Sequence, residues 1–359
     1  MDLPVSLTRT SDDVAIAWSP VGDPASGAPG LVLMPGAPFS DFVAEGRIEP
    51  SRRAYATLAR DVRIVQYDAR GSGHSQRDVT DLSLDAMLRD LDAVVEAASL
   101  DRVALLGFYS SVTSAIAYAA RHPDRVTHLI LFGGGTRGWS PMSGASTQAL
   151  LSLIERDWDT FAEAVAHAWL GWAGDPEGPQ VADWFRGATT PAMARATLQA
   201  ASGVDVTADA RRVRCPALVL HRRDATVVPL EVSEELAATL PRGELRILDG
   251  STATLFFEQP EIVIDAIVGF VGGRPVGRRR GEPDPTTGVR DVDRRPAGLS
   301  PREVEVLGLL ARGETNAQIA VALGLSINTV ERHVANLYRK IDARGRAEAS
   351  AFAVRNGLA

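Results

Sequence analysis

Short apolar runs alternate with helical patterns along the first three quarters of the chain. Runs such as 103–108 (VALLGF) and 217–221 (ALVLH) are almost continuously apolar, which is typical of parallel strands buried on both faces. Between them, residues 82–98 and 111–123 repeat apolar positions at helical spacing. This alternation predicts an α/β protein, with strands expected at 30–36, 62–71, 102–108, 126–135, 216–224 and 244–250.

Two further regions follow this α/β part, residues 1–271. Residues 272–298 are dominated by Gly, Pro, Arg and Asp and have no apolar periodicity, so we expect a flexible linker that cannot bury a core. Residues 299–359 return to helical spacing. We therefore predict an N-terminal domain over 1–271, a linker over 272–298 and a C-terminal domain over 299–359.

The C-terminal region has the pattern of a helix-turn-helix. Thr315 and Gln318 fit a capping box at the start of a short helix, and Gly324 fits its end. After a Gly-Leu-Ser turn, a longer helix places apolar residues on one face at Val330, Val334, Leu337 and Ile341. Two helices joined by so tight a turn, the second polar on its other face, predict a DNA-binding unit. A helical bundle with a solvated charged face is the alternative.

The residues 299–341, LSPREVEVLGLLARGETNAQIAVALGLSINTVERHVANLYRKI, resemble the C-terminal DNA-binding domain of the LuxR family of transcription regulators. The resemblance implies a small four-helix domain whose third helix enters the major groove of double-stranded DNA. Arg and Asn side chains on that helix suit contacts to guanine and adenine. The DNA-binding residues expected on it are Asn328, Thr329, Glu331, Arg332, His333, Ala335, Asn336 and Lys340.

The same resemblance implies a homodimer on DNA. Members of the family usually pair through the fourth helix. Here the candidates for that contact are Ala349, Ala351, Phe352 and Val354.

The stretch GFYSS (107–111) lies between a predicted strand and a predicted helix. The nucleophile elbow of an α/β-hydrolase, G-x-S-x-G, occupies such a turn. Gly107 fits the first glycine and Ser111 the second small residue, so Tyr109 occupies the nucleophile position. MPGAP (34–38) and DARGSGHS (68–75) resemble further motifs of this superfamily, and the first places an oxyanion-hole amide at Ala37. The resemblance covers roughly residues 5–271 and implies an α/β-hydrolase fold, a mostly parallel doubly wound sheet with a helical lid at about 137–208.

The catalytic triad of that fold is expected to be absent. Counting from Val228-Pro229 puts the acid position at Ala225, and counting back from Glu258 puts the histidine position at Ala253. Between His221 and His333 the chain contains no histidine at all. Loss of one triad member already lowers the rate on the order of 10⁴-fold. We therefore expect no enzyme activity, with Tyr109, Ala225 and Ala253 as vestigial positions.

Residual catalysis stays open as an alternative. In this alternative Ser110 or Ser111 replaces the missing serine, or Tyr109 is itself the nucleophile, as a tyrosine is in some glycosidases. A phenol nucleophile needs a base, and His74 and His221 are the candidates on paper. The protein would then be an active hydrolase or esterase attached to a DNA-binding domain.

We expect the N-terminal domain to bind a small apolar ligand. Five of the six tryptophans fall in the predicted lid, and aromatic side chains over a cleft form a typical small-molecule site. The ligand-binding residues expected are Ala37, Phe39, Tyr109, Ser110, Trp139, Trp169 and Trp172. The protein is then a one-component bacterial regulator whose ligand controls DNA binding. Alternatively, these aromatic residues fill the cleft, and the domain acts only in dimerisation or protein docking.

Composition and charge limit the cellular compartment that we expect and the part of the chain that can bind nucleic acid. The net charge of −7 gives no whole-chain signature of nucleic-acid binding, so a local face must carry that role. The single cysteine, Cys215, excludes an internal disulfide and favours a reducing compartment. Neither a signal-peptide pattern nor an apolar run of about 20 residues is present. These features predict a cytoplasmic protein without membrane, cofactor or metal.

Overall fold

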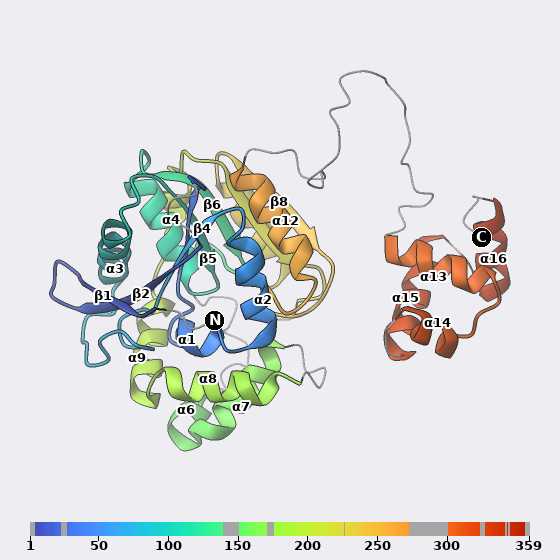
Figure 1. Ribbon diagram of the computed structural model, residues 1–359, viewed down its shortest axis with the longest axis horizontal. Coiled ribbons are helices and arrows are strands. Elements are labelled where there is room, and N and C mark those ends of the chain that lie inside the picture. Colours follow the sequence, from blue (N-terminus) through green and yellow to red (C-terminus); the bar gives the residue numbers. More distant parts are fainter. Residues whose placement is uncertain are drawn as a thin grey trace. The chain divides into compact units, whose positions relative to one another are not determined.

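The computed structural model describes residues 4–22, 27–138, 151–170, 176–225, 227–272, 301–323, 327–341, 343 and 345–355. The chain divides into two compact units, residues 1–280 and 281–359, which are described separately (Figure 1). The division falls near the predicted linker, whose residues from 273 onward lie outside the described part. No helix in the described ranges has the length and apolar character needed to cross a bilayer.

The first unit is built on an eight-stranded sheet of order β1-β2-β4-β3-β5-β6-β7-β8. β1 pairs with β2 and β2 with β4 in antiparallel fashion, and all other neighbours are parallel. All six predicted strands are present; the β1–β2 pair was not predicted. The strands are β1 (Ser6–Arg9), β2 (Ala15–Val21), β3 (Gly30–Leu33), β4 (Arg63–Tyr67), β5 (Val103–Phe108), β6 (Val126–Phe132), β7 (Ala217–Arg222) and β8 (Gly243–Leu248).

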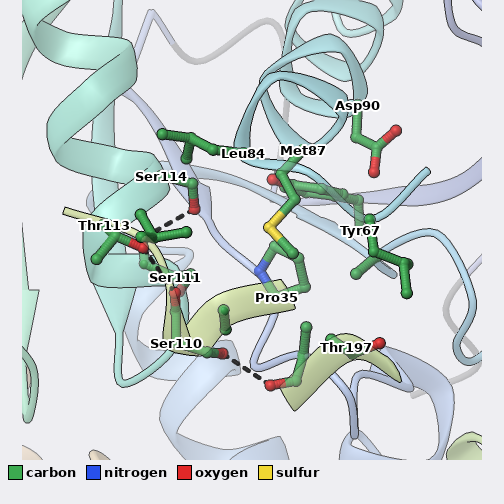
Figure 2. Close-up of a pocket in the computed structure, with 15 residues that line it drawn as sticks. Pro35, Tyr67, Leu84, Met87, Asp90, Ser110, Ser111, Thr113, Ser114 and Thr197 are labelled. Atoms are coloured by element: carbon green, nitrogen blue, oxygen red, sulfur yellow. Dashed lines mark hydrogen bonds between the residues drawn. The ribbon is translucent and has the colours of Figure 1, made fainter. Parts of the chain in front are cut away.

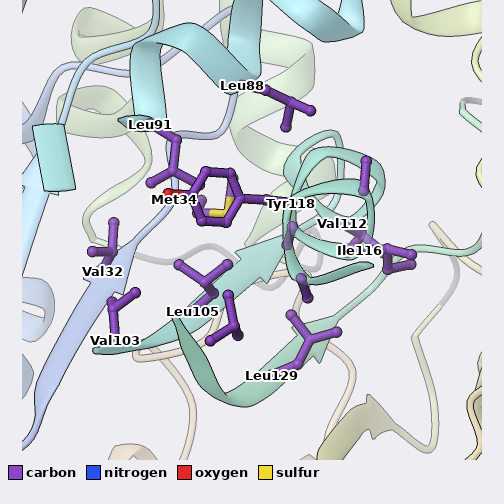
Figure 3. Packing of buried hydrophobic residues seen from close by; sticks show 14 of the residues in the cluster. Val32, Met34, Leu88, Leu91, Val103, Leu105, Val112, Ile116, Tyr118 and Leu129 are labelled. Atoms are coloured by element: carbon purple, nitrogen blue, oxygen red, sulfur yellow. The ribbon is translucent and has the colours of Figure 1, made fainter. Parts of the chain in front are cut away.

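Helices cover both faces of this sheet (Figure 1). α3 (Leu84–Ala97), α4 (Ser111–Arg121) and α11 (Leu230–Thr239) pack on one face, and α2 (Glu49–Leu58) and α12 (Pro260–Val271) on the other. Alternation along β5 divides its side chains between the two cores: Leu105 enters the first, and Leu106 enters the second. Figure 3 shows the first core, where Leu105 and Leu129 meet residues of α3 and α4. The predicted continuous apolar strands are thus explained by burial on both sides.

A lid of four helices lies over one end of the sheet (Figure 1). The helices are α6 (Leu153–Arg156), α7 (Trp158–Trp169), α8 (Gly178–Ala188) and α9 (Pro191–Ser202). Asp157 caps α7 by accepting a hydrogen bond from the Thr160 amide at 3.0 Å. The lid has its own core around Phe161 and Phe185, which Phe39 joins from the loop after β3. Two further short helices are α1 (Phe42–Glu45), which follows β3 in the chain, and α10 (Thr207–Ala210), which follows the lid and contributes Ala210 to the first core.

The described residues of the second unit form four helices, α13 (Pro301–Ala311), α14 (Asn316–Leu323), α15 (Ile327–Lys340) and α16 (Arg346–Arg355). The predicted capping box is present: the Thr315 amide donates to Gln318 Oε1 at 2.8 Å, and the Gln318 amide donates to Thr315 Oγ1 at 3.3 Å. Val330, Val334 and Leu337 are buried as their spacing predicted. This unit therefore has a hydrophobic core of its own.

Candidate functional site

The turn between β5 and α4 has the backbone of a nucleophile elbow. Tyr109 has a φ of 50°, in the left-handed region that a non-glycine residue rarely adopts. Gly107 is required beside it, because a Cβ there would lie 2.9 Å from that of Ala115. Ser111 completes the turn from inside: its hydroxyl accepts from the Phe108 amide and donates to the Phe108 carbonyl, both at 3.0 Å. The Ser111 hydroxyl is thereby committed to the Phe108 backbone.

The Tyr109 ring is packed against other aromatic side chains. It lies 5.1 Å from Trp169 and 5.9 Å from Phe132 between ring centroids. A Cβ on Gly133 would come within 2.7 Å of Tyr109 Cζ, so the phenol occupies the space that this glycine leaves free. Burial raises the pKa of Tyr109 above its usual value, with a smaller opposing effect of the Arg222 charge. The phenol therefore stays protonated, which makes it a poor nucleophile.

The oxyanion-hole loop approaches the elbow as predicted. The Ser110 hydroxyl donates to the Ala37 carbonyl at 2.8 Å, which joins the loop after β3 to the start of α4. Within the part of the chain that the structure describes, the amides of Ala37 and Ser110 donate to no protein acceptor. Both amides remain available to a carbonyl or carboxylate oxygen.

The predicted acid position carries no carboxylate that turns inward. Ala225 follows β7, and the neighbouring Asp224 is exposed to solvent, with its backbone amide donating to Gly250. Asp224 does not replace the missing acid in this arrangement.

The predicted histidine position is sealed by the lid. Ala253 is only 1% exposed, and its amide donates to the Trp169 carbonyl at 2.8 Å. The Glu258 carboxylate accepts from the amides of Ser251 and Thr252 at 2.9 and 3.0 Å. Trp169 therefore contacts two of the three positions that were predicted to be vestigial, Tyr109 through its ring and Ala253 through its backbone.

Arg222 at the end of β7 was not predicted as a site residue, yet it organises this region. Its side chain is buried, and its guanidinium donates to the backbone carbonyls of the loop after β8. The acceptors and distances are Thr254 at 3.2 Å, Asp249 at 3.2 Å, Leu255 at 3.2 Å and Glu258 at 2.5 Å. Burial lowers the pKa of Arg222, and Glu258 acts in the opposite direction. An arginine at the end of an apolar run gives no sequence signal for this role.

Neither histidine considered as a base partner hydrogen-bonds to Tyr109 in the described structure. His221 is 2% exposed, and its Nδ1 lies 2.9 Å from the Ser233 hydroxyl on α11. His74 Nδ1 lies 3.6 Å from carboxylate oxygens of both Asp41 and Asp68. The hydrogen bond with Asp68 is the main cause that raises the pKa of His74. These three residues also form the one potential metal-binding group found among the described residues, and their mutual charge pairing accounts for it.

Two cavities flank the elbow. The first is lined by Ala37, Ser110 and residues of α3, α4 and α9, among them Met87 and Thr197, as Figure 2 shows. The second is lined by Phe39, Trp169 and residues of β4, α1 and α8. Their free volumes are about 30 and 40 Å³, whereas small-molecule pockets usually measure ~300–1,000 Å³. In the described part of the chain the cleft thus holds no more than a few water molecules.

The predicted ligand-binding residues are therefore distributed over three places. Ala37 and Ser110 line the first cavity, Phe39 and Trp169 line the second, and Tyr109 lines neither. Trp169 covers the ring of Tyr109. Trp139 and Trp172 lie outside the described residues.

The second cavity has a polar end that the sequence did not reveal. Tyr55 donates to Glu45 Oε1 at 2.5 Å, and both side chains line the cavity. Gln66, which is 3% exposed, also lines it, and its Oε1 has no hydrogen-bond partner. The Trp184 Nε1 is likewise buried without a partner. A buried polar atom without a partner is costly, so this end of the cavity is suited to a polar group.

The candidate DNA-binding residues lie on α15. Glu331 and Ala335 are exposed one turn apart, and Thr329, His333 and Asn336 are partly exposed. The side chains of Asn328 and Arg332 lie outside the described part.

Lys340 and Asn336 are among the candidates with partners within the unit. Lys340 Nζ lies 2.8 Å from Glu303 Oε2, and Glu303 is 4% exposed. Arg339 donates to Asn336 Oδ1 at 2.7 Å. Of the residues suggested for dimer contact, Ala349 is buried in the unit's own core and Phe352 packs against that core; the side chains of Ala351 and Val354 are not described. Ala349 therefore cannot serve the dimer contact in this arrangement.

Comparison with known proteins identifies both units. The model of the family described as alpha/beta hydrolase fold matches residues 50–260, and the model of the bacterial regulatory proteins of the luxR family matches residues 297–353. Among curated proteins, a candidate carbamate hydrolase (RutD) from Caulobacter sp. (strain K31) is 29% identical over 221 residues, 59% of this chain and 81% of that protein. The AB hydrolase superfamily protein YisY of Bacillus subtilis (strain 168) is 25% identical, over 59% of this chain and 82% of its own length.

Solved structures show the same fold. The enol-lactonase from Burkholderia xenovorans LB400 aligns with a TM-score of 0.64 and 20% identity, over 75% of this chain and 100% of its own. The esterase RhEst1 from Rhodococcus sp. ECU1013 gives a TM-score of 0.65 and 23% identity, over 77% of this chain and 100% of its own. At such identities the likeness concerns the fold and not the reaction.

Proposed function

The chain belongs to the α/β-hydrolase fold family and ends in a LuxR-family DNA-binding domain, and from this we propose that it is a transcription regulator whose hydrolase-like unit senses a small ligand without turning it over. The combination of the two families supports the regulator role. Loss of turnover suits a receptor, because an enzyme would destroy its own signal.

The contacts around Trp169 are the observation that best supports the proposed absence of catalysis. The Trp169 ring packs on Tyr109 and its carbonyl binds the Ala253 amide, so the lid occupies the space above the vestigial nucleophile and beside the vestigial histidine position. Neither Ser110 nor Tyr109 has a histidine partner among the described residues. The related proteins are named as hydrolases. We propose that this chain differs from them in lacking catalytic activity, and these side chains are the only basis for that difference.

Ligand sensing requires that ligand binding favour one state of the protein over another. A ligand with equal affinity for both states shifts nothing, and coupling energies usually amount to about 1–3 kcal/mol. The free amides of Ala37 and Ser110 and the polar end of the second cavity support binding of a partly polar molecule. Because the cavities are small, the lid has to rearrange for the ligand to enter.

The same small volumes favour a second candidate function. In that alternative the aromatic lid permanently fills the cleft, and the hydrolase-like unit serves as a dimerisation or protein-docking module. Ligand addition would then alter neither the affinity for DNA nor the stability of the chain.

The test is DNA binding by the full chain to its own upstream region, measured at fixed salt with and without an apolar extract of the native cells. Salt is held constant because phosphate contacts make the affinity strongly salt-dependent. A shift of about fivefold or more supports sensing. The matched variant Trp169→Ala should bind DNA normally but respond differently to the extract. An unchanged affinity in both proteins would favour the docking module.

A further inference from the structure

The second cavity, defined above by Phe39, Glu45, Gln66, Trp169 and Trp184, has an acidic lining. Among the described residues that line it, three are carboxylic acids, and none is a lysine, arginine or histidine. The acids are Asp41, Glu45 and Asp68. Asp41 and Asp68 are compensated from outside by His74, 3.6 Å from each, whereas among the described residues the Glu45 carboxylate pairs only with the Tyr55 hydroxyl. A cationic group in this cavity would therefore meet a favourable potential near Glu45.

Gln66 offers a hydrogen-bond acceptor to this cavity. The Tyr55 hydroxyl uses its proton to bind Glu45. The Gln66 carbonyl oxygen is buried and has no hydrogen-bond partner in the described structure. An unpartnered carbonyl oxygen on a side chain that is 97% buried calls for a hydrogen-bond donor from the cavity.

The remaining walls are aromatic. Phe39 stacks on Phe185 with ring centroids 4.8 Å apart, and Trp169 lies 5.5 Å from Phe185. Such faces bind alkyl and aromatic groups and attract cations through their π electrons. The Trp184 N–H offers one further donor to an acceptor atom on the ligand body.

We propose that the second cavity binds the protonated head of a small apolar amine, with the ammonium group donating to Gln66 Oε1 and to the Glu45 carboxylate. The body of the ligand lies among the aromatic walls. The free volume of about 40 Å³ accommodates the head but not the body, so binding displaces Trp169 and α7 from their present position. This inference deepens the proposed sensor function and rests on it.

The titration of Glu45 agrees with this geometry. Burial raises its pKa to about 7, and the charges of Asp68 and Asp41 add to the effect, while the Tyr55 hydrogen bond opposes it. An arriving ammonium group favours the ionised carboxylate, so binding should release a proton at neutral pH.

The test uses isothermal titration of the full chain at pH 7.5 with benzylamine, benzyl alcohol and benzoate. These probes share one ring and differ in the head, which is cationic, neutral or anionic. Benzylamine should bind at least about tenfold more tightly than benzyl alcohol, because a charge-assisted hydrogen bond is the stronger kind. Benzoate should not bind.

Three variants test which side chains cause the preference for benzylamine. Glu45→Gln keeps the size and removes the charge, Gln66→Met removes the acceptor, and Glu49→Gln changes an exposed glutamate on α2 that pairs with Arg52. The first two should lose the preference for benzylamine, and the third should retain it. If Gln66→Met fails to fold, as judged by near-ultraviolet circular dichroism, the Glu45→Gln comparison still decides the question.

The inference is overturned if none of the probes binds, if benzoate or benzyl alcohol binds as tightly as benzylamine, or if Glu45→Gln keeps the preference. These failures are distinguishable from failure of the proposed function. A cell extract that still shifts DNA affinity would leave the sensor role intact and assign it a ligand of another class. An extract without effect would reject the sensor role itself.

Discussion

Trp169 lies against Tyr109, with 5.1 Å between ring centroids and 33° between ring planes. The contact joins the last residue of a lid helix to the residue at the tip of the elbow. In an active hydrolase this space must admit a substrate, because the nucleophile has to reach the scissile carbonyl. Here it holds two side chains of the protein itself.

Removal of the Tyr109 hydroxyl should not change the rate of ester hydrolysis. Tyr109→Phe is expected to hydrolyse p-nitrophenyl acetate at the same background rate as the unaltered chain, because a buried phenol with a raised pKa and no base partner does not act as a nucleophile. The measurement is initial rate at pH 8, with Ser110→Ala as the companion variant. A rate that drops to the buffer level in either variant would establish residual catalysis.

Truncation of Trp169 should destabilise the first unit. Trp169→Ala removes ring contacts with Tyr109, Phe108 and Phe185, and we expect a loss of about 2 kcal/mol in the free energy of unfolding, below the usual range for a fully buried tryptophan because this residue is partly exposed. Urea unfolding monitored by circular dichroism measures it. Trp169→Phe should lose less than half as much; equal losses would show that the ring contacts are unimportant.

Arg222 should be among the most sensitive positions of the unit. Arg222→Met leaves four carbonyls of the loop after β8 without their donor, which predicts a loss of at least about 3 kcal/mol in unfolding free energy. The neighbouring Arg223 is exposed and only pairs with Asp249 at 3.5 Å. Arg223→Met should therefore change stability by less than about 0.5 kcal/mol. Similar effects in the two variants would contradict the role assigned to Arg222.

Glu45 and His221 should give stability opposite slopes with pH. The Glu45 pKa rises from 4.5 to about 7 on folding, so the folded state binds the extra proton and stability falls as pH increases from 4.5 to 7. Burial lowers the pKa of His221 below its ordinary 6.5, so the unfolded state binds the extra proton and stability falls as pH decreases below 6.5.

Two variants separate these contributions. Glu45→Gln should make the chain relatively more stable at pH 7.5 than at pH 5, by up to about 2 kcal/mol in the difference, and His221→Gln should change the difference in the opposite direction. Chemical unfolding at the two pH values provides both numbers. A shift of the same sign in the two variants would refute the assignment.

An exposed acid on α15 should limit the attraction to DNA. Glu331→Lys is expected to strengthen binding and to steepen the dependence of log K on log salt by about 1, the value for one added phosphate contact. Glu305→Lys on α13 alters an exposed glutamate elsewhere in the unit and should leave the slope nearly unchanged. Equal slopes for both variants would place α15 away from the DNA.

The sequence predicted the sheet well where burial is complete, and poorly at its margin. β5 and β7 are buried on both faces and were recognisable as apolar runs, whereas β1 has four residues of alternating partial exposure, with Leu7 65% exposed. An edge strand needs few apolar residues, so its pattern resembles that of a loop.

Motif spacing alone was enough to assign the expected triad positions to Tyr109, Ala225 and Ala253. The contacts that fill the site were not predictable, since they arise between segments far apart in the chain. Trp169 meets Ala253, and Arg222 meets the carbonyls of 249–258, only once the lid and the sheet are assembled. Glu45 and Gln66 were missed for the same reason, because an acid on a short helix and an amide on a strand have no pattern in common.

The close approach of Tyr109 to Gly133 has a practical meaning for protein engineering. Any side chain at 133 would collide with the phenol, and any smaller residue at 109 would leave an opening above β6. A library that varies position 109 alone therefore samples mostly cavities, whereas one that varies 109 and 133 together can exchange volume between the two positions. These two positions form the smallest unit in which the elbow can be redesigned.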